Sequence, residues 1–338
     1  MGFTIRPERC VVAGVALVAL LSPSCSSHHG GALPLTQVAD VPFPGPANRF
    51  DYMSLDPSTE TLWIAHMDAS EVLGLDVRSR HVMTIVRGVP SVHGLLAVPA
   101  VHRVFASATD AHELFSIDER TGKIVTRTPA GAYPDGIAYA PPQNEVFVSD
   151  EVGGVETVVD AATGRRVATV PLGGEAGNVR YDPASRLVLV DVQTRNVVAV
   201  IDPATDRIVR RIPLPGCDHD HGLYVDPAHE LAFVACDGNA RLLVLDLRSD
   251  KVLQDFPTGP DPDVLAFDPG LERLYVSDES GVVAVFQENG SSIRPIGLGF
   301  LATEAHTVAV DPKTHLAYFA LEDVDGKPVL RIMAPRSR

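Results

Sequence analysis

The segment from Gly216 to Pro227 contains the densest group of side chains that could do chemistry. It reads Gly-Cys-Asp-His-Asp-His-Gly-Leu-Tyr-Val-Asp-Pro. Imidazole and carboxylate groups are ligands for divalent transition metals, and a cysteine adds a softer donor. The segment therefore favours metal ligation, provided that the surrounding elements bring further ligands to it.

Residues of the same kind recur about every 42 positions. Each stands five positions before an Asp-Pro turn or its equivalent, and these register residues are Asp51, His93, Asp135, Gly177, His221, Asp263 and His306. A second column of aspartates opens turns of the form Asp-x-x-Ser/Thr with the same period, at Asp76, Asp118, Asp160, Asp202 and Asp246. Such an aspartate can accept a hydrogen bond from the backbone two residues on, which suits a hairpin. Two columns with one period indicate a structural repeat.

Short apolar runs within each unit predict strands. Runs such as Val197–Ile201 are rich in β-branched residues, are too short for helices and are apolar on both faces. Four such strands in a unit of 40 to 45 residues are typical of a β-propeller, in which sheets stack face to face around an axis. Seven units predict an all-β, seven-bladed propeller.

Ring closure is predicted from the two ends of the repeat. The last unit, 306–334, has room for three strands only. The segment 35–45 matches the fourth strand of another unit, 207–216. We therefore expect the N-terminal strand to complete the C-terminal blade, which would pair edges that are otherwise exposed.

The repeats resemble a known family. Leu274-Tyr-Val-Ser-Asp278 and Val146-Phe-Val-Ser-Asp150, with Asp-x-x-Thr-Gly-Lys at 118–123, are similar to the YVTN-type repeats of exported bacterial seven-bladed propellers. The resemblance extends from Leu35 to the C-terminus and is more specific for fold than for function. It implies a secreted or surface binding protein. Related propellers include lactonases, a lyase and the copper domain of nitrous oxide reductase.

The first 25 residues are interpreted as an export signal. Arg6 and Arg9 precede an apolar run, 11–21, that is too short to span a bilayer. Cys25 follows small residues and resembles the lipid-attachment site of bacterial lipoproteins, with ordinary cleavage near Ser24 as the alternative. We expect 26–34 to form a flexible tether and 35–338 to form the propeller. The expected location is the periplasm or the outer cell envelope, with a lipid anchor.

Net charge limits the partners. The chain has 28 Lys and Arg residues against 43 Asp and Glu residues, a net charge of −15. Such a surface repels phosphate backbones and anionic lipids, so we expect no nucleic acid and no membrane contact beyond the lipid anchor. The partners left are a metal, a small molecule or an envelope protein, bound by a monomer.

The register residues are the candidate site. First strands line the channel of a propeller, so residues at their start should meet at the channel mouth. We predict a site for zinc, copper, another divalent cation or a small ligand, formed by Asp51, His93, Asp135, His221, Asp263 and His306. A secondary rim is expected from His66, Asp150, Asp218, His219, Asp220 and Asp278. Alternatively, these groups only hydrogen-bond neighbouring blades, with no cofactor.

The remaining cysteines and histidines have simpler interpretations. Cys217 and Cys236 are expected near the same rim, either as a disulfide, as soft metal ligands beside His219 or His221, or as free thiols. Five histidines fall in or beside predicted turns and are expected to be solvated: His81, His102, His112, His229 and His315.

The sequence favours a binding protein over an enzyme. The alternative is a metal-dependent, lactonase-like hydrolase or lyase, in which the metal polarises a carbonyl and His219 or His221 is the base. This sequence shows no counterpart of the Glu/Asn/Asp ligand set of the lactonases. A third possibility is a protein-interaction platform.

Overall fold

Aspartate-led turns set the strand boundaries. In the computed structural model, which describes residues 32–336, Asp76 Oδ1 accepts a hydrogen bond of 2.6 Å from the backbone N–H of Ser79. Asp160 does the same with Thr163 at 2.8 Å. These bonds satisfy backbone donors in the turn, so the apolar run on either side reverses direction as a hairpin.

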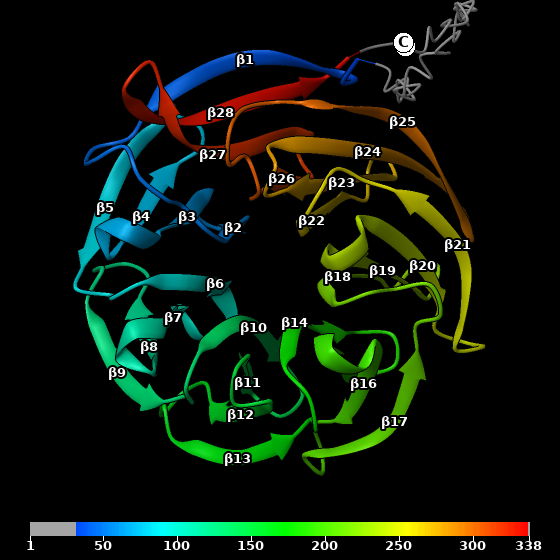
Figure 1. The fold of residues 1–338 in the computed structure, drawn as a ribbon. Coiled ribbons are helices and arrows are strands. Elements are labelled where there is room, and N and C mark those ends of the chain that lie inside the picture. The colour runs from blue at the N-terminus through cyan, green and yellow to red at the C-terminus, as the bar shows by residue number, and fades with distance from the viewer. Residues whose placement is uncertain (1–31, 337–338) are drawn as a thin grey trace, which may run out of the picture.

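Seven antiparallel sheets of four strands form the fold, and Figure 1 shows them as a ring around one axis. Blade 1 consists of β2 (Met53–Asp56), β3 (Thr61–His66), β4 (Glu71–Asp76) and β5 (His81–Arg87). Blade 2 consists of β6 (Val92–Val98), β7 (Arg103–Ala108), β8 (Glu113–Asp118) and β9 (Ile124–Pro129). Blade 3 consists of β10 (Pro134–Ala140), β11 (Glu145–Asp150), β12 (Val155–Asp160) and β13 (Arg166–Pro171).

The chain continues around the ring in the same order. Blade 4 consists of β14 (Ala176–Asp182), β15 (Leu187–Val192), β16 (Val197–Asp202) and β17 (Arg207–Pro213). Blade 5 consists of β18 (Asp220–Asp226), β19 (Leu231–Cys236), β20 (Arg241–Asp246) and β21 (Lys251–Pro257). Blade 6 consists of β22 (Pro262–Asp268), β23 (Arg273–Asp278), β24 (Val282–Asn289) and β25 (Ser292–Phe300). The predicted seven-bladed propeller is confirmed.

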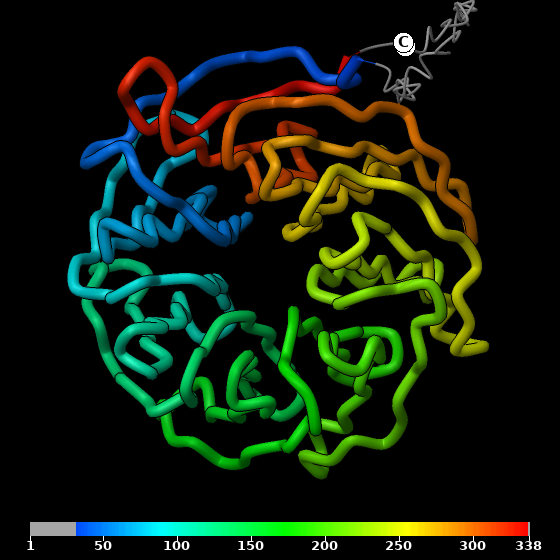
Figure 2. The backbone as a smooth tube through the Cα atoms, in the orientation of Figure 1, coloured from blue at the N-terminus to red at the C-terminus, as the bar shows by residue number. Residues whose placement is uncertain are grey.

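Blade 7 joins the two ends of the chain. It consists of β26 (Ala309–Asp311), β27 (Leu316–Val324), β28 (Lys327–Pro335) and β1 (Leu35–Pro42). In the β1–β28 pair, Leu35 lies opposite Pro335 and Pro42 opposite Val329. Figure 2 shows the blue N-terminal segment running beside the red C-terminal one. The expected closure by the N-terminal strand is therefore confirmed.

The last residues of the expected tether lie against blade 6. Leu33 packs against the hydrophobic core and lies close to Gly299 of β25, and Pro34 lies close to Gly297. A side chain at Gly297 would lie 2.3 Å from the Pro34 ring, so the glycine makes room for the entering chain. Residues 33–34 of the expected tether are therefore in contact with the ring. The expected export signal and the rest of the tether, up to residue 31, lie outside the described residues.

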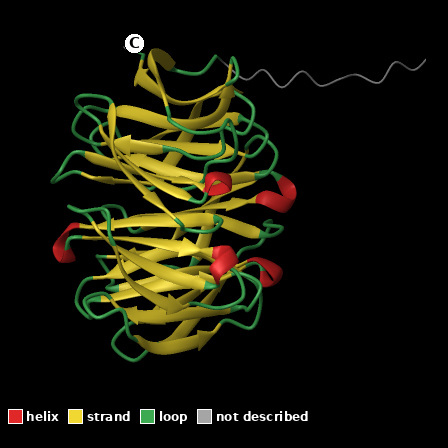
Figure 3. Ribbon diagram, turned by 90° about the vertical axis from the view of Figure 1, so that its left-hand side faces the viewer, coloured by secondary structure: helices red, strands yellow, loops and turns green. Residues whose placement is uncertain are grey.

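Apolar side chains fill the space between neighbouring sheets. Trp63 on β3 is 1% exposed, and its ring occupies the space beside Gly74 of β4, where a Cβ would lie 2.9 Å from the indole. Figure 3 shows the ring from the side, with strands layered through the molecule. Burial on both faces explains the nearly continuous apolar runs and holds the first strands rigidly around the channel.

Short connections at the edges of the ring complete the structure. Single 3₁₀ turns occur at η1 (Met67–Ala69), η2 (Pro99–Val101), η3 (Thr109–Ala111), η4 (Gln193–Arg195) and η5 (Asp237–Asn239). Within 32–336, no helix is both long enough and apolar enough to span a membrane.

Candidate functional site

The register residues meet at the end of the channel where the first strands begin. A cavity of about 220 Å³ there is lined by Asp51, His93, Asp135, His221 and Asp263. His306 is fully buried beside this cavity, and one of its ring nitrogens lies within 4.8 Å of carboxylate oxygens of Asp51 and Asp263. The repeat therefore brings six chemically active side chains to one mouth.

Gly177 is the seventh register residue and contributes no side chain. A Cβ at this position would lie 2.9 Å from the carbonyl oxygen of Asp220 and 3.1 Å from that of His221. The backbone of β18, the first strand of blade 5, thus fills the space that a side chain at position 177 would need. Close approach of the two strands requires the glycine.

Asp51, Asp263 and His306 form a group of possible metal ligands at the mouth, and His306 forms a second, less buried group with Glu279 and Glu304. His306 Nδ1 lies 3.1 Å from the carbonyl oxygen of Glu304, which fixes the proton on Nδ1. Nε2 is buried without a hydrogen-bond partner among the described residues. A lone pair on Nε2 is therefore left for a ligand.

Negative charge accumulates around these three residues. Burial raises the pKa of Asp51 well above its usual value, and repulsion from Asp135 and Asp263 raises it further. Burial also raises the pKa of Asp135. Carboxylates that are crowded in a desolvated site resist ionisation together. A bound cation would relieve this repulsion.

His221 and Asp263 form an ion pair. His221 Nε2 lies 3.2 Å from Asp263 Oδ1, although the two groups are not aligned as a hydrogen bond. Burial alone would lower the pKa of His221, but the carboxylates of Asp263 and Asp135 raise it to about 10. The same ion pair outweighs burial at Asp263 and lowers the pKa of that carboxyl. His221 is therefore an imidazolium at neutral pH.

Both ring nitrogens of His93 already have protein partners. Nε2 lies 3.0 Å from the hydroxyl of Tyr133, and Nδ1 lies 2.8 Å from the carbonyl oxygen of Ser91 and 2.9 Å from Thr109 Oγ1. Tyr133 was not anticipated from the sequence, because it lies outside the register column. It belongs to the loop that enters β10.

Asp150 positions the loop that carries Tyr133. Its two carboxylate oxygens accept hydrogen bonds from the backbone N–H groups of Ala132, at 2.9 Å, and Tyr133, at 2.8 Å. Gly131 has φ +120°, and a Cβ there would lie 2.0 Å from an Asp150 oxygen. Asp150, expected at the secondary rim, therefore binds protein backbone.

Other members of the expected rim also contact protein groups. Asp278 accepts a hydrogen bond from the N–H of Gly259 at 2.8 Å, and Asp220 accepts one from Val192 at 3.0 Å. His66 lies 2.6 Å from Asn48 Oδ1 and stacks on Phe50, away from the cavity lining. The Asp220 bond joins neighbouring blades, as in the alternative expectation, whereas Asp278 and His66 contact the loop that enters their own blade. Asp218 is exposed beside the mouth.

Arg49 is a cavity residue that the register column did not predict. Its guanidinium forms ion pairs with Glu279, at 2.5 Å, and Glu304, at 3.4 Å. The cavity lining also contains groups outside the column, namely Glu151, Gln193, Asp237 and Asp261. Their positions depend on how the loops fold over the mouth, which the repeat does not specify.

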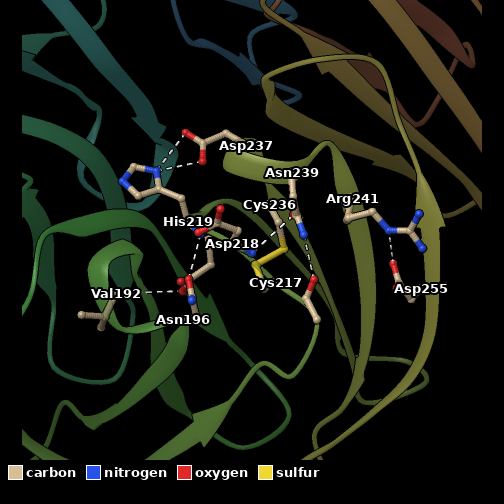
Figure 4. The surroundings of a disulfide bond; sticks show 12 residues. Val192, Asn196, Cys217, Asp218, His219, Cys236, Asp237, Asn239, Arg241 and Asp255 are labelled. Atoms are coloured by element: carbon tan, nitrogen blue, oxygen red, sulfur yellow. Dashed lines mark hydrogen bonds and ion pairs between the residues drawn. A yellow bond between two sulfur atoms is a disulfide. The ribbon is translucent and has the colours of Figure 1, made fainter.

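Cys217 and Cys236 form a disulfide with a Cα–Cα distance of 5.5 Å, and Figure 4 shows its surroundings. The bond pins the loop before β18 to the end of β19. His219 lies on this loop with φ +63°, and its Nδ1 is 2.8 Å from Asp237 Oδ1. His219 and Asp237 both line the cavity, so the disulfide holds an Asp–His pair at the mouth.

Two histidines that were expected to be solvated bind carboxylates between blades. His229 Nδ1 lies 2.8 Å from Asp226 and 3.5 Å from the buried Glu288, and His315 Nδ1 lies 2.9 Å from Asp268. Asp226 belongs to the same turn as His229, whereas Glu288 and Asp268 lie on blade 6, next to the blades that carry the two histidines. These pairs lie near the opposite ends of the first strands.

Comparison with known proteins shows similarity in fold alone. No protein-family model matches the chain, and no curated protein is similar to it in sequence. Among solved structures, a chain of hydrazine synthase from Kuenenia stuttgartiensis matches with a TM-score of 0.73 and 15% identity, over 88% of this chain and 98% of that one. A chain of a mitotic checkpoint complex matches with a TM-score of 0.73 and 10% identity, over 96% and 99%.

Proposed function

We propose that this propeller is an exported binding protein that holds one divalent transition-metal ion at the channel mouth. The ligands would be Asp51, Asp263 and Nε2 of His306. The observation that carries the proposal is the buried, unpartnered Nε2 of His306, in a histidine that has one ring nitrogen within 4.8 Å of two carboxylates. An orphaned polar atom at full burial is costly, and a metal bond would satisfy it.

The donor set indicates which ions fit. Two carboxylates and one imidazole suit zinc, divalent copper and similar ions. Thiolate ligation is not offered, because Cys217 and Cys236 are joined to each other. The neighbouring groups support the ligands, since Glu304 fixes the tautomer of His306 and the His221 imidazolium pairs with Asp263. A small ligand could then complete the coordination from the cavity.

The disulfide supports the proposal that the protein is exported. Disulfides persist in oxidising compartments such as the periplasm and are rare in the cytosol. Together with the signal-like segment 1–25 and the resemblance to YVTN-type repeats, the Cys217–Cys236 bond favours a location in the cell envelope. Cys25 would carry a lipid anchor.

Metal content tests the proposal directly. The chain from Ala32 onward contains the whole described ring and leaves out His28 and His29, which could bind metal by themselves. After chelation and reconstitution with zinc or copper, elemental analysis should find about one ion per chain. His306→Ala should lose that ion, whereas His81→Ala, which changes an exposed histidine on β5, should keep it.

Two outcomes would contradict a metal site. One is the absence of bound metal after reconstitution with zinc, copper, manganese, nickel and iron. The other is equal metal content in His306→Ala and His81→Ala. Thermal unfolding of both variants shows whether each remains folded.

The Asp237–His219 pair favours a second candidate, a metal-dependent hydrolase or lyase. Asp237 accepts from Nδ1 of His219, which would leave Nε2 of the ring as a base. His221, the other base considered, holds its proton because its pKa is about 10. A metal bound nearby would polarise a carbonyl. Turnover of a lactone panel that is lost in His219→Gln and kept in His81→Ala would favour this candidate, and no turnover would exclude the lactones tested.

A further inference from the structure

A second, larger cavity lies at the other end of the channel. Its volume is about 460 Å³, and residues from the middle and far end of the first strands line it, including Leu96, Val98, Ile137 and Leu265. The metal site described above lies at the beginning of the same strands. The two cavities therefore belong to opposite mouths of the propeller.

Tyr52 and Asn178 separate the two cavities. Tyr52 lines both of them, and its hydroxyl accepts a hydrogen bond of 2.7 Å from Asn178 Nδ2. Tyr52 belongs to blade 1 and Asn178 to blade 4, on opposite sides of the ring. This bond crosses the channel and forms a floor beneath the larger cavity.

Arg180 is the one charged residue that lines the larger cavity. It lies on β14, three residues after the register position Gly177. At the equivalent position the other blades carry small, apolar or aromatic residues: Ser54, Leu96, Ala138, Tyr224, Ala266 and Ala309. The repeat thus places a single guanidinium in an otherwise uncharged ring of the channel wall.

The charge of Arg180 has no counter-ion in contact with it. Nη1 donates a hydrogen bond of 2.9 Å to the carbonyl oxygen of Val179, and no carboxylate of 32–336 lies within 4.0 Å of the guanidinium. Arg49, the arginine that lines the cavity at the other mouth, differs in this respect, since it contacts two glutamates. Arg180 is partly buried and keeps its proton, so it is a cation in a largely apolar chamber, and the carboxylates that act on it, Asp191 and Asp135, are not in contact with it.

We infer that the larger cavity binds a small organic acid whose carboxylate pairs with Arg180 and whose apolar body lies against the cavity wall. A guanidinium binds a carboxylate through two parallel hydrogen bonds, which are strong where water is excluded. The volume is within the range of small-molecule sites, and apolar walls with one oriented polar group are typical of them. The site is independent of the metal at the opposite mouth.

Octanoate and 1-octanol are the matched probes, because they share a chain and differ in charge. Isothermal titration calorimetry of the metal-free chain from Ala32 should show octanoate binding at least tenfold tighter than 1-octanol, a preference that reports the ion pair. Affinity should rise about fourfold per added CH₂ from hexanoate to octanoate as apolar surface is buried.

Arg180→Met tests the assignment, because it removes the charge and keeps the length of the side chain. The preference for octanoate over 1-octanol should fall to about twofold or less. Arg207→Met is the control, since Arg207 is an exposed arginine at the start of β17 in the same blade. It should keep the full preference. If Arg180→Met does not fold, Arg180→Lys keeps the charge without the planar fork and should retain a weaker preference for the acid.

Three results would overturn the inference. The first is no octanoate binding to the folded chain, and the second is equal affinity for octanoate and 1-octanol. The third is octanoate binding that appears only when zinc is added and vanishes in His306→Ala, because the acid would then bind at the metal mouth. Metal binding itself is measured separately, so failure of either site leaves the other one testable.

Discussion

Tyr52 and Asn178 meet across the channel with 2.7 Å between the phenolic oxygen and the amide nitrogen. Both side chains are buried, and Asn178 Oδ1 has no hydrogen-bond partner among the described residues. The bond joins blades that are far apart in the sequence, so it restrains the ring from inside. It also divides an acidic mouth from an apolar one.

We expect Tyr52→Phe to destabilise the protein by about 1 to 3 kcal/mol, because Asn178 then loses a partner at full burial. The free energy of unfolding in urea is the measurement. Tyr181→Phe is the control, since its hydroxyl makes no hydrogen bond with the described residues and it lines the same larger cavity. Its effect should be within about 0.5 kcal/mol. Equal stability of the two variants would show that the cross-channel bond contributes nothing measurable.

Removal of the disulfide should destabilise the fold. The bond closes a loop with a sequence separation of 19, and restricting such a loop in the unfolded chain is worth about 3 kcal/mol. The double variant Cys217→Ser, Cys236→Ser should therefore unfold at lower denaturant, and a reducing agent should shift the wild-type midpoint in the same direction but leave the variant unchanged. A wild-type midpoint that ignores the reducing agent would contradict the prediction.

Glu156 should make stability depend on pH. It is fully buried on β12, Ser149 donates to it at 2.7 Å, and burial raises its pKa to about 8. A carboxyl whose pKa is raised on folding favours the folded state when protonated. Its contribution is therefore lost as the pH rises from about 4.5, the unfolded value, to about 8.

Glu156→Gln removes this titration. The variant should gain stability over the wild type by at least about 1 kcal/mol between pH 5 and pH 8, since one pKa unit corresponds to about 1.4 kcal/mol. Unfolding free energies at several pH values test this. Glu113→Gln, at the start of β8, is the control for the same substitution at another strand. A difference between Glu156→Gln and the wild type that stays constant with pH would rule out the predicted titration.

The N-terminal strand should be indispensable. Deleting 35–41 removes most of β1 and exposes the hydrogen-bonding edge of β28. We expect the midpoint of thermal unfolding to fall by more than about 10 °C, with aggregation, since a fall of about 2 to 4 °C corresponds to 1 kcal/mol in a large domain. A chain that starts at Ala32 is the control. An unchanged midpoint after the deletion would mean that blade 7 is stable with three strands.

Gly131→Ala should disturb the loop that carries Tyr133. The new Cβ would overlap the Asp150 carboxylate, and φ +120° is unfavourable for alanine. We expect a loss of about 2 to 4 kcal/mol from both effects. Gly173→Ala, at φ +80° with open space around it, isolates the cost of the backbone conformation and should lose about 1 kcal/mol. If both variants lose the same free energy of unfolding, the Asp150 side chain moves aside for the methyl group at no energetic cost.

The fold could be predicted from the sequence because its determinants repeat. Two of the aspartates that open the turns, Asp202 and Asp246, accept the expected hydrogen bond from the backbone two residues on. Asp76 and Asp160 accept theirs from three residues on. The match between 35–45 and the fourth strand of another unit predicted that the N-terminal strand would complete the last blade, as the β1–β28 pair does. A periodic signal averages over many weak local preferences, which is why it was sufficient here.

The site could be predicted only in part, because its details depend on loops that do not repeat. The column placed Asp51, Asp263 and His306 near the mouth, but it carried no information on Arg49 or Tyr133. Those side chains reach the cavity through loop conformations that tertiary contacts decide. The tautomer of His306 and the charge of His221 also depend on which side chains and carbonyl groups lie next to them, and the repeat does not specify those neighbours.

The place of β1 in the ring decides how the molecule is presented to its surroundings. β1 is the outermost strand of blade 7, so the chain enters the propeller from its circumference and not at either mouth. An attachment through residues before Ala32 would therefore be at the circumference of the ring, beside blade 7. Both mouths of the channel then face away from the point of attachment, and the metal and the organic acid that we propose would enter at different mouths.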